Sequence, residues 1–403
     1  MGVSTFRSAL ILLVLTAIVP LQAALRDAGV DGWLLYDFRG INSISKGLVG
    51  IEGFVSRRWF VWLPAEGAPV AITHVIEQAP WQAWPSAWKN HQYSAWTELE
   101  AAVAGCVQGR TIAMEYSPGD AVPYVDYIPA GVLELVRAAG ATVVSSGDLV
   151  TRFLAVWTDA DRASHAVAAE QLKTIAYAAF KRAGDAAHAG APITEWALTE
   201  WIKGEFAKVG LTTDHGPNVS AGANAALPHY DPSPDHPVLL KEGDIVLIDL
   251  WALAKGGMWA DQTYMASIGA PSARAREVWA AVRDARDAAI TLLREQLAAG
   301  GPVRGGAADD AARAVIVQRG FGKYFTHRTG HSIDASGLHG SGAHLDNLET
   351  REERALLDGV GFSIEPGIYI AGDIGMRTEV NAYVQGRTLV VTPKEPQQEI
   401  FVV

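Results

Sequence analysis

A chain of 403 residues, 49% of them hydrophobic, is long enough for two domains, because single hydrophobic cores stop growing at about 250–300 residues. Its 33 basic and 44 acidic residues give a formal net charge of −11, and no basic run is longer than Arg57–Arg58, which argues against a nucleic-acid partner. The single cysteine, Cys106, excludes an intrachain disulfide and a thiolate metal cluster, and its small apolar neighbours predict that it is buried.

The first 23 residues have two interpretations. They resemble a secretory signal peptide, with a basic residue at Arg7, an apolar run from Ala9 to Val19 and small residues near Ala23. The apolar run is too short for a stable membrane span. However, residues 21–38 read as a helix leading directly into a strand, so cleavage near Ala23 would cut that helix. An N-terminus extended upstream of the true start would give the same pattern. We expect a cytoplasmic protein, with export through a signal peptide as the alternative.

Residues 24–155 are predicted to form a first domain in which strands and helices alternate. A helix is expected within residues 122–140, followed by a strand at 142–146. Four further runs are rich in β-branched and aromatic residues and end near glycine, proline or serine, which is typical of strands; they span residues 32–38, 57–64, 67–74 and 111–118.

Residues 156–403 are predicted to form a second domain, which begins with a long alanine-rich helix capped by Thr158 or Asp159. Strands and turns dominate from about residue 243. Further helices are expected at residues 194–209, 273–299 and 307–319. This mixture of elements predicts an α/β (α+β) fold for the whole chain.

Three histidines lie close together in the stretch HRTGHSIDASGLHG: His327, His331 and His339. Histidine serves both as a metal ligand and as a proton carrier near neutral pH. The four-residue step from His327 to His331 resembles a helical zinc site, but that motif has glutamate directly after its first histidine. Here Arg328 follows, and Gly330 argues against a helix, so the partners of these histidines must lie elsewhere in the chain.

Two aspartates are placed symmetrically in the predicted hairpin of residues 243–269. Asp249 and Asp261 lie at equal distances from Lys255 in the turn, and residues paired in this way have Cβ atoms about 4.5–5.5 Å apart. Two buried carboxylates so placed repel each other, and a cation would remove the conflict. The alternative is one solvent-exposed aspartate on each strand, but Asp249 follows the apolar run IVLI.

A second predicted hairpin, residues 361–384, repeats the arrangement. Glu365 and Glu379 lie symmetrically about the turn at 371–373, although Pro366 weakens the prediction of register. Four carboxylates with at least one imidazole suit a dinuclear site of oxygen-rich ligands, with metals about 3.5–4 Å apart.

Five segments of the sequence resemble those of a known family. The segments LIDLWA, ADQT, RTGHSID, SIEPGIY and RTEVN are similar to the metal-binding segments of the metallopeptidase family of aminopeptidase P, prolidase and methionine aminopeptidase. The resemblance implies a pita-bread catalytic domain and, over about the first 150 residues, a creatinase-like N-terminal domain of the prolidase branch. It also implies five ligands for two divalent ions, of which manganese is expected and iron, cobalt or zinc would also fit: Asp249, Asp261, His331, Glu365 and Glu379.

Roles for these and other residues follow from the same resemblance. Asp261 and Glu379 would bind both metals and His331 only one, with a hydroxide bridging the metals and Glu365 transferring its proton. His339 and His229 match the family's substrate-side histidines, although either could be an ordinary surface-loop residue. Supporting or substrate-side roles are expected for four further residues, namely Arg377, Thr263, His327 and Tyr369. His344 and His236 are expected on the surface.

The implied activity is hydrolysis of a peptide bond near a free N-terminus in a short peptide, by an Xaa-Pro aminopeptidase or dipeptidase, with a homodimer as the expected assembly. The sequence departs from the family in three places. Gly340 stands where an acid usually follows the second histidine, His331 and His339 are one residue further apart than usual, and the segment 327–334 has fewer glycines. These departures concern the substrate and the place of His339, not the five ligands.

Three other functions are compatible with parts of this pattern. The first is lyase chemistry on a small sulfonium acid at the same metal site, and the second is a metal-free, creatinase-like amidinohydrolase. The third is a binding module that has kept the fold without catalysis. The complete set of five ligands argues against the last two.

Overall fold

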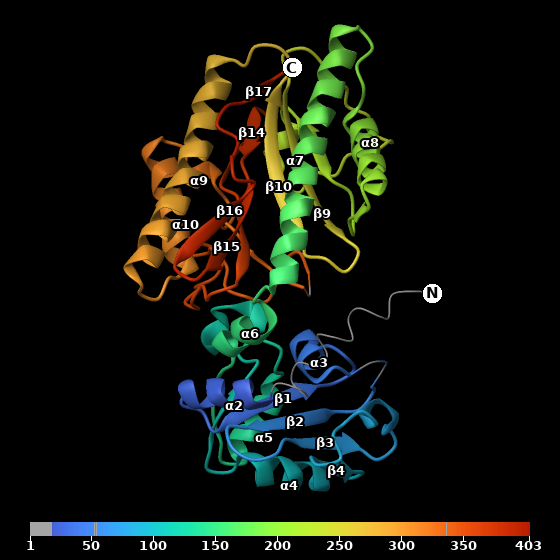
Figure 1. Ribbon diagram of the computed structural model, residues 1–403, viewed down its shortest axis with the longest axis vertical. Helices are drawn as coiled ribbons and strands as arrows, with labels where there is room; N and C mark the ends of the chain where they lie inside the picture. The colour runs from blue at the N-terminus through green and yellow to red at the C-terminus, as the bar shows by residue number, and fades with distance from the viewer. Residues whose placement is uncertain (1–17, 52, 54, 336) are drawn as a thin grey trace. The chain divides into compact units, whose positions relative to one another are not determined.

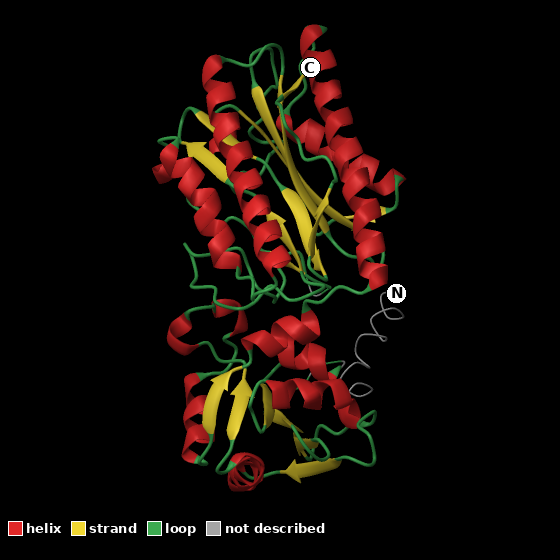
Figure 2. Ribbon diagram, turned by 60° about the vertical axis from the view of Figure 1, so that its left-hand side comes forward, coloured by secondary structure: helices red, strands yellow, loops and turns green. Residues whose placement is uncertain are grey.

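The computed structural model describes residues 18–51, 53, 55–335 and 337–403, so most of the possible signal peptide, residues 1–17, lies outside the described part. The chain divides into two compact units, Met1–Leu154 and Ala155–Val403 (Figures 1 and 2). Helices and strands are mixed in both units, as the α/β prediction requires.

The predicted helix near the N-terminus is present and runs through Ala23. Helix α2, Ile18–Asp27, buries Leu21 and Leu25, and Gln22 Nε2 donates to the carbonyl oxygens of Pro64 at 3.2 Å and Gly67 at 2.7 Å. Cleavage after Ala23 would therefore remove buried contacts of the first unit. Within the described part of the chain, no helix combines the length and apolar character that crossing a membrane requires.

The first unit is built on a six-stranded sheet of order β4-β3-β2-β1-β5-β6. The central strand β1 is buried on both faces: Trp33 and Leu35 belong to one core, and Leu34 and Tyr36 to the other. Cys106 is buried, as predicted. The strands are β1 Gly32–Asp37, β2 Trp59–Pro64, β3 Val70–His74, β4 Lys89–Tyr93, β5 Thr111–Met114 and β6 Thr142–Ser145.

Helices and short 3-10 turns surround this sheet. The predicted helix within 122–140 is shorter than expected, because Pro123 and Pro129 confine the α-helical part to α5, Ala130–Ala138. The other helices of the unit are α3 Ser43–Val49, α4 Trp96–Val107 and α6 Gly147–Leu154, with 3-10 turns η1 Ala79–Trp81, η2 Pro118–Asp120 and η3 Pro123–Val125.

The second unit begins with helix α7, Asp159–His188. Thr158 is its N-cap and forms a capping box with Asp161, as the sequence predicts. The predicted helices at 194–209, 273–299 and 307–319 are also present (Figure 1). They are α8 Glu195–Lys208, α9 Ala273–Ala299 and α10 Gly305–Gln318, and the unit also contains the 3-10 turns η4 Asn224–Ala226 and η5 Gly322–Tyr324.

Two sheets and a two-stranded ribbon lie among these helices (Figure 2). The first sheet has the order β17-β10-β9-β7, with β8 also paired to β9; its strands are β7 Leu211–Thr212, β8 Asn218–Ala221, β9 Ile245–Ala254, β10 Ala260–Ser267 and β17 Phe401–Val402. The second has the order β11-β12-β15-β16, with β11 Ser332–Ile333, β12 Gly361–Ile364, β15 Val380–Gln385 and β16 Thr388–Thr392. The ribbon pairs β13 Gly367–Ile370 with β14 Ile374–Arg377.

The two faces of β9 have different neighbours. Side chains alternate between faces along a strand. Even-numbered residues from Val246 to Ala252 pack in the core that includes α7, whereas Ile245 and Leu247 pack in the core that includes α9. Asp249 and Trp251 follow on the second face, which is the face that carries the candidate site.

The register of the β9–β10 hairpin differs from the prediction by two residues. Asp249 pairs with Thr263 and Asp261 pairs with Trp251, so the two aspartates are diagonal neighbours rather than directly opposed. In the connecting segment Met258 is buried and its N–H donates to Ser164 Oγ at 3.0 Å instead of pairing with β9, and the second strand begins at Ala260. A shift of two preserves the face, and both aspartates still lie on the same side.

Candidate metal centre

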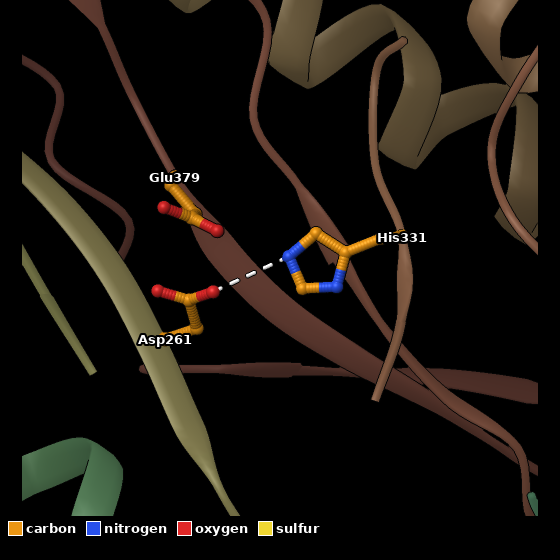
Figure 3. A group of neighbouring side chains, drawn as sticks. All are labelled: Asp261, His331 and Glu379. Carbon is orange, nitrogen blue, oxygen red and sulfur yellow. Dashed lines mark ion pairs between the residues drawn. The ribbon is translucent and has the colours of Figure 1, made fainter. Parts of the chain in front are cut away.

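Three predicted ligands meet at one point in the second unit. Asp261, His331 and Glu379 each offer a ligand atom, and these atoms lie within 4.8 Å of one another (Figure 3). His331 Nε2 is 3.3 Å from Asp261 Oδ2 and 3.5 Å from Glu365 Oε1, so a fourth predicted ligand lies at the same imidazole. All of these side chains are buried or nearly so.

The second hairpin has the predicted register. Ile364 pairs with Val380 and Gly367 pairs with Arg377, which frames Glu365 and Glu379 as symmetric positions between two paired segments. The backbone N–H of Glu379 donates to the carbonyl of Thr263 on β10 at 3.2 Å. This hydrogen bond joins the two acidic hairpins and brings their carboxylates together.

The cluster has too little positive charge to balance its carboxylates. Arg377 forms an ion pair with Asp249, whereas Glu379 Oε1 is buried and, among the described residues, has no hydrogen-bond partner. A buried carboxylate oxygen without a partner is costly. One arginine cannot neutralise four carboxylates, and an orphaned oxygen beside an imidazole nitrogen is a suitable ligand set for divalent cations.

The pKa shifts agree with this charge imbalance. Burial, reinforced by Asp261 and Glu365, raises the pKa of Asp249 to about 6 despite the opposing effect of Arg377. Burial and then neighbouring carboxylates also raise the pKa values of Asp261 and Glu379 well above their ordinary values. Burial alone would raise the pKa of Glu365 too, but His331, His327 and two arginines, Arg377 and Arg328, together outweigh it and hold that pKa low.

His331 is oriented for ligation through one nitrogen. Its backbone N–H donates to Ser363 Oγ at 3.0 Å, and its Nδ1 lies 3.0 Å from the carbonyl of Ser332. Burial lowers the pKa of the ring. A neutral imidazole that donates from Nδ1 leaves the lone pair of Nε2 directed at the carboxylates, which is the usual way a metal-binding histidine is oriented.

Arg377, Thr263 and the carboxylates form one hydrogen-bonded group. Arg377 Nε donates to Thr263 Oγ1 at 2.9 Å, and that hydroxyl lies 2.9 Å from Glu379 Oε2 and 3.1 Å from Asp249 Oδ1. A hydroxyl carries one proton, so Thr263 can donate to one of these acids at a time. The group fixes the positions of both acids.

His327 and Tyr369 lie at the edge of this group. His327 Nε2 is 2.8 Å from the Tyr369 hydroxyl, and its Nδ1 is 2.7 Å from the carbonyl of Arg328. The Tyr369 hydroxyl is also 3.4 Å from Arg377 Nη1. Both residues therefore contact the arginine side of the cluster rather than its ligand atoms.

The other two predicted histidines are exposed. His339 packs against His331 with ring centroids 4.2 Å apart, and the electrostatic effect of His331 is the largest of those that lower its pKa to about 3. His229 lies on the loop between η4 and β9. His339 is thus beside a candidate ligand, and a neutral ring there can donate one hydrogen bond.

Comparison with known proteins identifies the family. Residues 168–386, more than half of the chain, match the model of metallopeptidase family M24. The chain belongs to this family.

Individual relatives agree with this membership. The M24 chain is 35% identical over 162 residues to an Xaa-Pro dipeptidase of Lactobacillus helveticus, covering 40% of each chain. It is 26% identical over 330 residues to a probable dipeptidase PepE of Mycobacterium tuberculosis, covering 79% of this chain and 78% of that protein. The chain spans less than half the length of the two Lactobacillus Xaa-Pro dipeptidases it matches, 40% and 47%.

A solved structure matches nearly the whole chain. The crystal structure of dipeptidase PepE from Mycobacterium ulcerans superposes with a TM-score of 0.72 at 24% identity, covering 98% of both chains. At this identity the likeness shows the fold. The predicted α/β fold with a pita-bread domain is therefore confirmed.

Close contacts in the loop that carries His339 explain why glycine occupies position 340 in this M24 chain. The N–H of Gly340 donates to the carbonyl of Ser332 at 2.7 Å, and a Cβ at this position would lie 2.8 Å from Asp334 Cγ. Asp334 Oδ2 accepts from both the N–H and the hydroxyl of Ser341, at 2.7 and 2.9 Å. An acid in place of Gly340 would therefore clash with the side chain that holds the loop.

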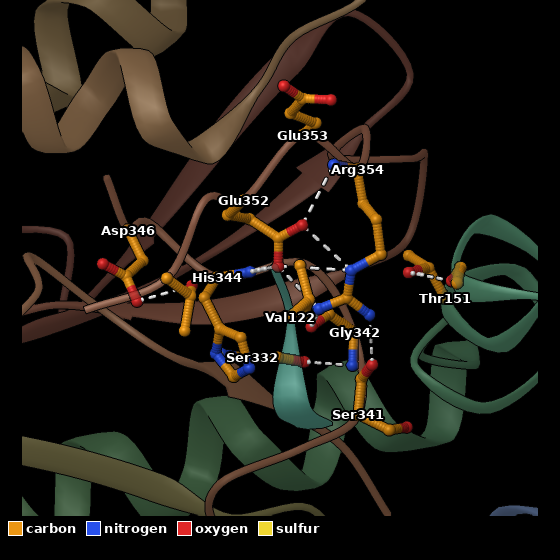
Figure 4. Close-up of polar contacts among 12 residues, drawn as sticks. Val122, Thr151, Ser332, Ser341, Gly342, His344, Asp346, Glu352, Glu353 and Arg354 are labelled. Carbon is orange, nitrogen blue, oxygen red and sulfur yellow. Dashed lines mark hydrogen bonds and ion pairs between the residues drawn. The ribbon is translucent and has the colours of Figure 1, made fainter. Parts of the chain in front are cut away.

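His344 is buried, contrary to the prediction of a surface position. Its Nδ1 accepts from the N–H of Ser332 at 2.9 Å, and its own N–H donates to Glu352 Oε2 at 3.2 Å (Figure 4). Arg354 pairs with Glu352 and donates to the carbonyls of Ser341 and Gly342 at 2.6 and 2.7 Å. These contacts, which sequence spacing does not reveal, tie the His339 loop to the strand that follows His331.

A buried glutamate holds the loop that carries His229. Glu195, the first residue of α8, accepts from the N–H of Ala221 at 2.7 Å, from Asn224 Nδ2 at 3.0 Å and from the hydroxyl of Tyr230 at 2.6 Å. The loop is thus fixed at its start, its middle and the residue after His229. Sequence reasoning missed Glu195, because it lies 34 positions before His229 in the chain.

Two other supporting residues could have been found from the sequence. Ser363 Oγ donates to Glu365 Oε1 at 3.0 Å, and Asn381 Oδ1 accepts from the N–H of Asp261 at 2.9 Å. Each lies two positions from a ligand that directly adjoins its strand, and the two residues pair with each other across β12 and β15. The period of two along a strand is the signal that places them on the face of the ligands.

Proposed function

We propose that this chain is a dinuclear-metal hydrolase that cleaves peptide bonds near a free N-terminus, as an Xaa-Pro dipeptidase or Xaa-Pro aminopeptidase. The observation that carries the proposal is the buried group of carboxylates around His331, with Glu379 Oε1 left without a partner among the described residues. Membership of the M24 metallopeptidases supports the reaction class, and the names of the relatives support the Xaa-Pro substrate.

Five residues would hold two divalent cations: Asp249, Asp261, His331, Glu365 and Glu379. The donor set of carboxylate oxygens and one imidazole nitrogen suits manganese, and iron, cobalt or zinc can also bind such a set. Bound there, the cations would lower the pKa of a water molecule and polarise the carbonyl of the substrate.

The surrounding residues have distinct tasks in this proposal. Glu365, next to His331 and hydrogen-bonded by Ser363, takes the proton of the attacking water and passes it to the leaving amine. His339 and His229 donate hydrogen bonds to the substrate. Arg377 and Thr263 keep Asp249 and Glu379 in place through the contacts described above.

The test is substrate profiling of purified, metal-reconstituted protein. Xaa-Pro dipeptides and longer Xaa-Pro peptides are assayed with and without added manganese, beside a small sulfonium acid as a lyase substrate. We expect manganese-dependent release of the N-terminal residue, and dipeptides hydrolysed in preference to longer peptides would identify a dipeptidase. Conversion of the sulfonium acid without peptide hydrolysis would contradict the proposal.

Further parts of the proposal concern the whole protein. We propose that residues 24–155 form a creatinase-like domain, that residues 156–403 form the catalytic domain, and that the protein is a cytoplasmic homodimer. Light scattering tests the assembly, for which we expect twice the chain mass of 43.0 kDa. N-terminal sequencing of the protein from its own cells tests the location, because export would remove about 23 residues.

A further inference from the structure

One aromatic side chain lies on the face of the candidate site without a part in the proposed mechanism. Trp251 is two residues after Asp249 on β9, so both point to the same face. In the register of the sheet Trp251 is paired with Asp261. Cβ atoms of such pairs are about 4.5–5.5 Å apart, which places the side chain of Trp251 at its base beside that of a candidate ligand.

Along this face the environment changes from core to solvent. Leu247 and its partner Met265 are buried in the core, and the next pair, Asp249 and Thr263, belongs to the carboxylate cluster. Trp251 comes next and is partly exposed. The large apolar residue therefore lies where the face opens, and not where the core needs filling.

On the side of β9 away from β10, neither β7 nor β8 pairs with Trp251, and a short connecting segment passes it instead. β7 pairs with β9 at Leu253 and Ala254, whereas β8 pairs with β9 from Val246 to Asp249. The connection between β7 and β8 includes residues 213–217, which pass the level of Trp251 without pairing to it. This segment supplies two side chains that contact the indole.

These two side chains fix the orientation of the ring. The indole N–H of Trp251 donates to Asp214 Oδ1 at 2.8 Å, and the ring of His215 meets the indole edge-on, with centroids 5.3 Å apart at 73°. The backbone N–H of His215 donates to the same Asp214 oxygen at 2.9 Å. A tryptophan held at its polar edge keeps its flat apolar surface in a defined position.

We propose that Trp251, oriented by Asp214 and His215, forms one wall of a subsite that selects a large apolar side chain in the amino-terminal residue of the substrate. The inference rests on the proposed function, in which the second residue is proline. The side chain that varies among such substrates is that of the first residue, so a selective apolar surface beside the metal ligands acts on it. In an apolar pocket, side chains that differ by a single methylene group are discriminated by about 10- to 200-fold.

The test compares ratios of kcat/KM within one manganese-loaded protein preparation, which removes the effect of the amount of folded enzyme. For Trp251→Ala we expect the preference for Leu-Pro and Phe-Pro over Gly-Pro to fall by about tenfold or more. Trp251→Phe keeps an aromatic surface and should retain most of the preference. Trp196→Ala, a matched change of a surface tryptophan on α8, should leave the ratio at its parental value.

Three results separate this inference from the proposed function. An active parent whose ratio is unchanged by Trp251→Ala would overturn the inference alone. A change confined to discrimination between proline and alanine in the second residue would also overturn it, because the wall would then act on the other side of the scissile bond. A manganese-loaded parent that hydrolyses none of the peptides would contradict the proposed function itself.

Discussion

Glu115 in the first unit and Glu379 in the second are both buried glutamates, but their oxygens have different partners. Glu115 accepts from the indole N–H of Trp33 at 2.5 Å, from Asn42 Nδ2 at 2.9 Å and from Ser45 Oγ at 2.9 Å. Glu379 accepts from Thr263 through one oxygen, and its other oxygen has no partner among the described residues. The first acid is satisfied by neutral donors of its own unit.

This difference separates a structural acid from a candidate ligand. Both carboxyls have a raised pKa because of burial, so burial and a shifted pKa do not distinguish them. The distinguishing features are the unpartnered oxygen and the neighbouring carboxylates of the Glu379 group. Glu195 resembles Glu115 in being satisfied by protein donors, but its donors belong to the loop that carries His229.

The largest expected effect tests the candidate ligand. Glu379→Gln keeps the shape but removes one negative charge from the cluster, and we expect kcat/KM of the manganese-loaded protein on Xaa-Pro dipeptides to fall by about a thousandfold or more. Glu353→Gln, an exposed glutamate of the same unit, is the control and should retain parental activity. Glu379→Gln activity within tenfold of the parent would place Glu379 with the structural acids.

The next effect concerns the arginine beside the cluster. Arg377→Lys loses the fork that contacts both Asp249 and Thr263, and we expect kcat/KM to fall by about 10- to 100-fold. Manganese affinity, measured by calorimetry, should fall in parallel. The matched variant Arg351→Lys changes an exposed arginine and should alter neither quantity. Unchanged metal affinity in Arg377→Lys would show that the cluster does not depend on this contact.

A smaller loss of activity is expected when the contact between Glu195 and the loop that carries His229 is weakened. Tyr230→Phe removes the hydrogen bond next to His229, and we expect kcat/KM to fall by about tenfold. In a His229→Ala background the same change should have little further effect, because the loop then has no substrate contact to position. Tyr177→Phe, which removes a hydroxyl from a tyrosine of α7 outside this loop, is the control. Independent, multiplicative losses in the double variant would reduce Glu195 to a purely structural acid.

The smallest effect on activity is expected for Glu115→Gln, which should leave kcat/KM at the parental value. Its effect is on stability. Burial raises the pKa of Glu115 from 4.5 to about 7, so the folded state holds the proton more tightly than the unfolded state. The free energy of unfolding should fall as pH rises from 4.5 to 7, by about 3 kcal/mol, and then level off.

Urea denaturation between pH 4.5 and pH 8, followed by tryptophan fluorescence, checks this pH dependence. Seven of the thirteen tryptophans lie between Trp33 and Trp96, so unfolding of the first unit contributes to the signal. In Glu115→Gln this contribution to the pH dependence should disappear, whatever the stability of the variant at one pH. If the free energy of unfolding changed equally with pH in parent and variant, Glu115 would not be the source of this pH dependence.

Much of the fold and of the candidate site was predictable, because both follow local periodicity. The capped helix at Thr158 and the acidic hairpin centred on residue 372 have short-range signals. The register at Asp249 was not predictable from spacing, because the connection between the strands includes a hydrogen bond from Met258 to Ser164 in α7, which is distant in sequence. Burial of His344 and the role of Glu195 likewise depend on contacts distant in sequence.

The central claim is that the acidic hairpins and His331 form a centre for two divalent ions. Equilibrium dialysis of the purified chain against manganese, followed by metal analysis, tests it most directly. We predict two ions per chain for the parent protein and fewer than two for Asp261→Ala, together with loss of manganese-dependent peptidase activity. Two bound ions and full activity in Asp261→Ala would contradict the dinuclear centre.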